Sequence, residues 1–148
     1  MAVNEENSCA FYASDYHLEM IMLPYINRNL EKNKNIYIFT QNNLEKTINT
    51  LINKVNIEKE LKNKILNINW DTNDESKYNK LIDDKSETVI FIKGNEEYIN
   101  KVNKNLKQIK DYKNMEVIDC YNIEEIGSRT NSIINSYKAV LTVKGMNK

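Results

Sequence analysis

The chain has 148 residues, of which 41% are hydrophobic and 28% charged, a balance typical of a soluble globular domain and not of a disordered chain. Lysine plus arginine and aspartate plus glutamate number 21 each, so no net charge points to nucleic acid or an anionic membrane. No apolar run reaches the roughly 20 residues of a membrane helix, and the N-terminal MAVNEENS is polar, so we expect a cytoplasmic protein.

Six short apolar runs suit β-strands, and stretches with helical spacing separate them. The strand candidates are Cys9–Tyr12, Ile36–Thr40, Ile65–Trp70, Thr88–Lys93, Met115–Cys120 and Ala139–Lys144. Some of these runs, such as VIFI, are apolar on both sides, as buried parallel strands are. The alternation predicts one three-layer α/β domain spanning residues 1–148. Its mainly parallel sheet of about six strands has helices on both faces and Cys9–Tyr12 near the centre.

The helical stretches carry start and stop signals of their own. Pro24 lies inside the first one and should kink or divide it. The patterns Asn42-x-x-Glu45 and Asn122-x-x-Glu125 resemble capping boxes at helix starts. The segment Asp71–Lys85 is acidic and only weakly periodic, so we expect it to be the least ordered part of the chain.

The first strand, loop and helix form a unit that cradles a nucleotide phosphate in many proteins, yet the loop Ala13–His17 contains no glycine. A phosphate loop needs the pattern GxxxxGK[ST], and none of the three glycines begins it. The run Glu116–Asp119 is similar to the apolar strand and terminal aspartate of a Walker B motif, although an acidic residue near a strand end is common. A degenerate nucleotide-binding protein or ATPase is therefore retained as an alternative.

Other catalytic signals are weak. Cys9 and Cys120 lie in apolar runs without the spacing of metal ligands, which favours two buried side chains and no metal site. His17 is the only histidine, and its neighbours Ser14 and Asp15 share its loop. Adjacency in sequence does not arrange a nucleophile, a base and an orienting group. We therefore expect no catalytic residues, no cofactor and no enzymatic activity.

Ligands of parallel α/β sheets bind outside the carboxyl ends of the strands. The residues expected there offer aromatic rings, hydroxyls, an amide and a carboxylate, which suit a small-molecule pocket. The candidate ligand-binding residues are Tyr12, Ser14, Asp15, His17, Thr40, Gln41, Trp70 and Tyr121. We expect this edge to form the main cleft, with Trp70 or Tyr121 on its wall and His17 at its rim.

Taken in order, these segments resemble the MEDS domain, a sensory domain of methanogen and methylotroph regulators. The resemblance covers nearly the whole chain through soft, mostly structural motifs. They are Ala10-Phe11-Tyr12, Pro24-Tyr25-Ile26 followed by Leu30, Ile36–Thr40, Val117–Tyr121, Ile123–Tyr137 and Ala139–Gly145. Where the family often has a His-Pro pair before the last strand, this chain has Ser136-Tyr137-Lys138. Its first loop, Ala13-Ser14-Asp15, carries fewer acidic residues than in relatives.

The resemblance implies a fold related to the RecA-like ATPase core with the phosphate loop lost. It also implies a non-catalytic sensory or regulatory domain that binds a small ligand or a signalling partner such as a kinase or transcription regulator. Two alternatives stay open: the degenerate ATPase named above, and a protein-interaction adaptor without a small ligand.

Overall fold

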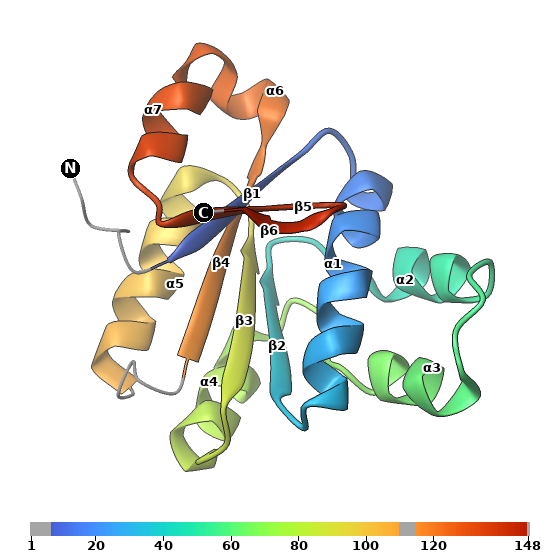
Figure 1. Cartoon of the computed structure of the whole chain (residues 1–148). Coiled ribbons are helices and arrows are strands. Elements are labelled where there is room, and N and C mark those ends of the chain that lie inside the picture. The colour runs from blue at the N-terminus through green and yellow to red at the C-terminus, as the bar shows by residue number, and fades with distance from the viewer. Residues whose placement is uncertain (1–6, 110–114, 148) are drawn as a thin grey trace.

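The computed structural model describes residues 7–109 and 115–147, so the expectation for the polar N-terminal residues 1–6 lies outside it. In the described residues, six strands form one sheet in the order β2-β3-β4-β1-β5-β6 (Figure 1). They are β1 (Ser8–Tyr12), β2 (Asn35–Thr40), β3 (Thr88–Lys93), β4 (Met115–Asn122), β5 (Ala139–Thr142) and β6 (Gly145–Asn147). Every neighbouring pair is parallel except β5 and β6. The α/β class and the mainly parallel sheet are therefore confirmed, with β1 in the sheet interior.

Helices connect the parallel strands, as the alternating pattern predicts. In the described part of the chain they are α1 (Asp15–Glu31), α2 (Glu45–Ile52), α3 (Lys59–Leu66), α4 (Asp74–Asp83), α5 (Glu96–Ile109), α6 (Ile123–Ile126), the 3₁₀ helix η2 (Gly127–Arg129) and α7 (Thr130–Asn135). α6 and α7 lie beyond the ends of β1 and β4 in Figure 1. The connection between β4 and β5 therefore lies at one end of the sheet.

The strands are apolar on both sides because their side chains alternate between two buried clusters. In β3, Val89 and Phe91 belong to one cluster and Ile90 and Ile92 to the other. The first cluster includes residues of α1, α2 and α3, and the second includes residues of α4, α5 and α6. All residues of β3 are buried. Each fully buried aliphatic or aromatic side chain stabilises the fold by about 1.5–3 kcal/mol, so this strand anchors both clusters.

The prediction of a strand at Ile65–Trp70 is wrong. Helix α3 ends at Leu66, and the remaining residues form the connection to α4. The chain continues to turn at this point, because the Ile68 amide donates to the Ile65 carbonyl at 3.1 Å. The indole Nε1 of Trp70 donates to the same carbonyl at 2.8 Å and fastens the connection to the end of the helix. The apolar run that suggested a strand therefore belongs to the end of α3 and to the turn that follows it.

The prediction that Asp71–Lys85 is the least ordered segment is also wrong, because it contains helix α4. The Asn73 side chain accepts a hydrogen bond from the Ser76 amide at 3.3 Å and caps the start of the helix. Leu81 is fully buried and fastens the helix to the core. Tertiary packing thus stabilises a helix whose own periodicity is weak.

Three smaller expectations change. Helix α1 continues through Pro24, which does not divide it. Helix α2 begins at Glu45, whose amide donates to the side chain of Asn43 and not of Asn42. The predicted strand Ala139–Lys144 ends earlier, at Thr142, and the chain then turns into β6, which pairs antiparallel with β5. Gly145, the first residue of β6 after the turn, has φ 112°, a conformation that favours glycine.

Candidate functional site at the carboxyl edge of the sheet

The parallel register brings the carboxyl ends of β1 to β4 to one edge of the sheet. Thr40 pairs with Lys93 at the ends of β2 and β3, and Tyr12 pairs with Asn122 near the ends of β1 and β4. Ligands of such sheets bind at this edge. The candidate residues at the ends of β1, β2 and β4 therefore lie at this edge, as the sequence predicts, whereas Trp70 follows no strand.

The first loop is too short to wrap a phosphate. β1 ends at Tyr12 and α1 begins at Asp15, which leaves two residues between them. The Ser14 hydroxyl accepts from the His17 amide at 3.1 Å and caps α1. His17 Nδ1 in turn accepts from the Ala13 amide at 2.9 Å, and the ring is half-buried. Ser14 and His17 thus hold the loop together through local hydrogen bonds.

A buried lysine joins the ends of three strands. The Lys93 ammonium lies 2.9 Å from the Asp15 carboxylate and donates to the Asn42 side-chain oxygen at 2.6 Å. Asn42 donates back to Asp15 at 3.0 Å, which closes the triangle. The ammonium also lies 5.2 Å from the centre of the Tyr12 ring. We call Tyr12, Asp15, Asn42 and Lys93 the Lys93 cluster.

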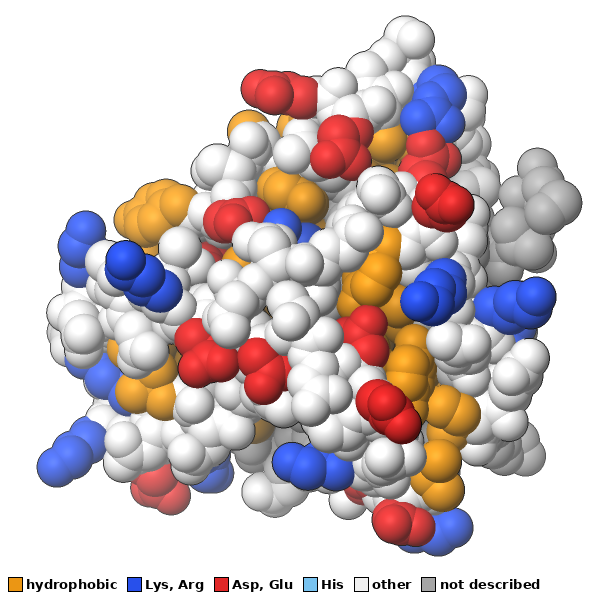
Figure 2. Space-filling view, turned by 180° about the vertical axis from the view of Figure 1, so that it is seen from behind, with side chains coloured by type: hydrophobic (Ala, Val, Ile, Leu, Met, Phe, Trp, Pro, Cys, Tyr) orange, Lys and Arg blue, Asp and Glu red, His pale blue; other side chains and the backbone are white. Residues whose placement is uncertain are grey.

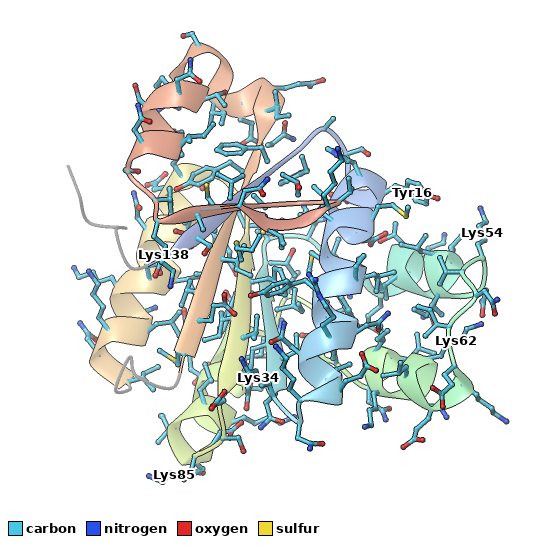
Figure 3. The ribbon with its side chains drawn as sticks, in the orientation of Figure 1. Tyr16, Lys34, Lys54, Lys62, Lys85 and Lys138 are labelled. Atoms are coloured by element: carbon cyan, nitrogen blue, oxygen red, sulfur yellow. The ribbon has the colours of Figure 1, made fainter. Side chains whose placement is uncertain are left out.

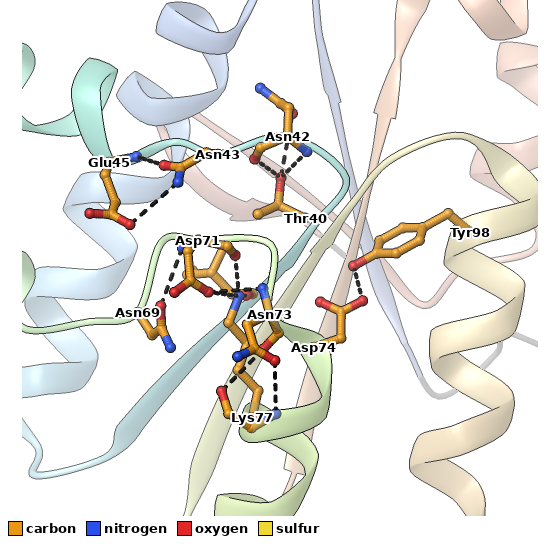
Figure 4. Close-up of polar contacts among 12 residues, drawn as sticks. Thr40, Asn42, Asn43, Glu45, Asn69, Asp71, Asn73, Asp74, Lys77 and Tyr98 are labelled. Carbon is orange, nitrogen blue, oxygen red and sulfur yellow. Dashed lines mark hydrogen bonds and ion pairs between the residues drawn. The ribbon is translucent and has the colours of Figure 1, made fainter.

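Within the Lys93 cluster the lysine is buried and its polar partners reach the surface. The Lys93 side chain is only 8% exposed, whereas that of Asp15 is 35% exposed and Asn42 is exposed. The Thr40 hydroxyl donates to the Asn42 carbonyl at 2.8 Å and fixes the Asn42 turn over the end of β2 (Figure 4). Removing one partner of such a pair leaves an uncompensated buried charge, which costs several kcal/mol.

A second buried carboxyl lies next to this cluster. Glu19 of α1 is fully buried, and the Thr47 hydroxyl donates to its Oε2. Its other oxygen, Oε1, has no hydrogen-bond partner among the described residues. Burial raises the pKa of Glu19, and the nearby Asp15 charge raises it further, while the hydrogen bond from Thr47 and the Lys93 charge lower it. A raised pKa favours the neutral acid, which tolerates this burial better than a carboxylate does.

A cavity of about 300 Å³ opens at the same edge, between the ends of β3 and β4. It is lined by Gly94, Asn95, Glu96, Glu97, Tyr121, Asn122, Glu125 and Ile126. The backbone at Gly94 allows a close approach, because a Cβ there would lie 2.5 Å from both the Gln41 side-chain oxygen and the Tyr98 ring. That Gln41 oxygen accepts from the Asn95 amide at 2.7 Å and fixes the rim. Several Asp and Glu side chains lie in the upper part of Figure 2, the end of the molecule at which α6 lies, and others lie across the middle and lower parts of the same face.

The two aromatic candidates differ in their roles. Tyr121 lines the cavity, stacks with Phe11 at a centroid distance of 6.0 Å, and bonds to the Tyr137 hydroxyl. Trp70 is 2% exposed and lies in the core cluster of α1, α2 and α3. Its carbonyl accepts from the Leu44 amide at 3.0 Å, so it lies beside the start of α2. The indole is a core side chain and does not line the cavity between the ends of β3 and β4.

Asp119, the residue that suggested a Walker B strand, does not face this edge. It lies inside β4, opposite Cys9 and Ile92, and is fully buried. Its carboxylate accepts from the Tyr137 hydroxyl at 2.6 Å and from the Asn103 amide at 3.0 Å. Burial raises its pKa to about 6 against these hydrogen bonds. Its oxygens therefore accept hydrogen bonds from within the protein. The residue also lies three positions before the end of β4, and not at the carboxyl edge.

Sequence reasoning missed Lys93, Asn42 and Glu19. Asparagine and lysine are so frequent in this chain that single residues of either type carry little information. Lys93 nevertheless had a usable signal, because it directly follows the apolar run VIFI of a buried strand. Glu19 had none, since a glutamate in a helix is ordinarily exposed.

The described residues define an α/β protein with a charged carboxyl edge. Within them, no three His, Cys, Asp or Glu side chains come together as a metal site, and none of the helices has the length and apolar character needed to span a bilayer. The chain matches no family model, no curated protein and no solved structure.

Proposed function

We propose that this chain is a non-catalytic sensory or regulatory domain of the MEDS type, which binds a small ligand or a signalling partner at the carboxyl edge of its sheet. In this proposal the fold is a three-layer, RecA-like core that has lost its phosphate loop. The observation that carries the proposal is the Lys93 cluster. A buried lysine paired with a carboxylate lies there, at the edge where α/β proteins bind their ligands.

The local chemistry favours a ligand other than a nucleotide phosphate. In P-loop proteins, backbone amides and a lysine surround the phosphate after the first strand. Here the corresponding position holds the Asp15 carboxylate in the first turn of α1, already paired with Lys93. A phosphate there would meet a like charge. The adjoining cavity carries Glu96, Glu97 and Glu125, which add to the repulsion.

The cavity beside the Lys93 cluster supports a small ligand more than it supports the adaptor alternative. A volume of about 300 Å³ is at the lower limit for a small-molecule pocket, and Tyr121 offers an aromatic wall there. A pure protein-interaction surface needs no such hollow.

The test removes the cluster without leaving a buried unpaired charge. The double variant Asp15→Asn with Lys93→Met removes both charges, and replacing a whole buried ion pair is often neutral for stability. Lys104→Met, at an exposed lysine of α5, is the matched control. Native mass spectrometry of the purified proteins should find a co-purifying small molecule on the wild type and the control, and not on the double variant.

Each rival predicts a different result. Thermal stabilisation by ATP with Mg²⁺, together with phosphate release, would establish the ATPase alternative, because a ligand that binds only the native state stabilises it. A wild-type chain that carries no small molecule, yet binds a signalling protein through the same edge, would establish the adaptor.

A further inference from the structure

A second cavity, of about 490 Å³, lies along the outer edge of β2, away from the carboxyl-edge site. Its walls combine apolar side chains, among them Ile36, Ile38 and Ile68, with four lysines. The lysines are Lys34, Lys64, Lys77 and Lys80, and no Asp or Glu lines the cavity within the described residues. Lys34 lies at the start of β2, at the lower end of the sheet in Figure 3. The cavity is therefore both apolar and positively charged.

The backbone of β2 adds hydrogen-bond donors to this cavity. β2 is an edge strand, and it pairs only with β3 in the described residues. The Asn35 amide donates to the carbonyl of Glu87, the residue before β3, and the Gln41 amide donates to the carbonyl of Lys93, the last residue of β3. The odd-numbered residues of β2 therefore turn their backbone N–H and C=O groups toward β3. The alternate residues Ile36 and Ile38 must then turn theirs outward. Their N–H groups face the side of the strand on which the cavity lies.

Lys77 closes one end of this edge. It is 1% exposed, and its ammonium donates to the Ile38 carbonyl and the Asp71 carbonyl, both at 2.5 Å (Figure 4). The Asp71 carboxylate lies 3.8 Å away. Burial lowers the pKa of Lys77, although the neighbouring Asp71 charge opposes this. Because the ammonium occupies the outward carbonyl of Ile38, an added peptide strand cannot pair along the whole edge.

The remaining positive charge is only partly compensated. Lys34 pairs with Glu87 at 3.5 Å. Lys64 and Lys80, in the last turns of α3 and α4, are exposed and form no ion pair with the described residues. Both lysines line the cavity together with Ile36, Ile38 and Ile68.

From this geometry we propose that the β2 edge cavity binds a small organic anion, a compound with an apolar body and a carboxylate, sulfonate or phosphate group. The apolar body contacts Ile36, Ile38 and Ile68, and the anionic group lies between Lys64 and Lys80. A volume of about 490 Å³ lies within the usual range of small-molecule sites. This site is independent of the proposed function at the carboxyl edge.

The test uses two dyes that differ in charge. The anionic probe is 1-anilinonaphthalene-8-sulfonate, which fluoresces when its rings leave water, and the neutral probe is N-phenyl-1-naphthylamine, which lacks the sulfonate. The variant is Lys64→Gln with Lys80→Gln. The control is Lys104→Gln with Lys107→Gln, which removes the same charge from exposed positions of α5. Lys107 lies in the last turn of its helix, as Lys64 and Lys80 do in theirs. Circular dichroism checks that all proteins fold alike.

We expect the affinity for the anionic probe to fall by about fivefold or more in the Lys64/Lys80 variant, because this variant loses the charge-assisted hydrogen bonds to the probe. In the control the affinity should stay within about twofold of the wild-type value. The neutral probe should bind both variants alike. In ¹⁵N–¹H spectra of the wild type, the amides of Ile36 and Ile38 should shift on adding the anionic probe.

Equal loss of the anionic probe in both variants would overturn the proposal, as would shifts confined to Gly94 and its neighbours at the carboxyl edge. A glutamate-rich peptide that displaces the probe and shifts every residue of β2 would assign this edge to a protein segment, which also overturns the small-anion proposal.

Discussion

The buried carboxyl of Asp119 gives the sharpest prediction for this protein. In the folded chain it is fully buried in β4, and burial raises its pKa from the ordinary 3.8 to about 6. In Asp119→Asn, the amide keeps the shape of the side chain and can still accept from Asn103. Its NH₂ group can donate to the Tyr137 hydroxyl, which can then donate to Tyr121.

The magnitude follows from the difference between the two pKa values. A rise of about 2 units corresponds to about 3 kcal/mol, since each unit is worth 1.36 kcal/mol. The carboxyl is protonated in both states below its ordinary pKa, so its full contribution to stability is present there. That contribution is lost as the pH rises through about 6, because ionisation is unfavourable in the folded state.

Urea unfolding of the wild type and Asp119→Asn at intervals from pH 4 to pH 8 measures this effect. The unfolding free energy of the variant minus that of the wild type should rise by about 2 kcal/mol between pH 4 and pH 7, because the unfolded carboxyl is already partly ionised at pH 4. The subtraction removes contributions common to both proteins, including that of Glu19, whose pKa is raised in the same direction. Asp83→Asn, at an exposed position of α4, is the matched control for replacing a carboxyl by an amide. A flat difference for Asp119→Asn would refute the reasoning.

Three further substitutions test the fold around the site, each by urea unfolding. Gly94→Ala should cost about 1–3 kcal/mol, because the new Cβ would lie 2.5 Å from the Gln41 oxygen; a neutral effect would show that the approach is not constrained. Trp70→Ala should cost about 3–5 kcal/mol as a core substitution, and a cost below about 1 kcal/mol would place the indole outside the core. Ser14→Ala should cost about 1 kcal/mol through loss of the α1 cap, whereas Ser14→Thr should restore most of it.

Local patterns in the sequence were sufficient for the fold class. The strands β1, β2, β3 and β4 fall on short apolar runs, which are typical of parallel strands because these bury both faces. The order of strands and helices then leaves a mainly parallel sheet as the natural arrangement. Ile65–Trp70 failed because a short apolar run has the same composition in a strand and at the end of a buried helix.

For the candidate site, the sequence by itself determined that the ends of β1, β2 and β4 would supply polar and aromatic groups, since strand ends follow from the strands. Only the tertiary structure decided which groups meet. The pairing of Lys93 with Asp15 joins residues that are far apart along the chain, and no local pattern encodes such a distance. Burial is likewise a property of the folded chain, so the raised pKa of Asp119 and the charged cavity beside β2 arise only when the helices pack on the sheet.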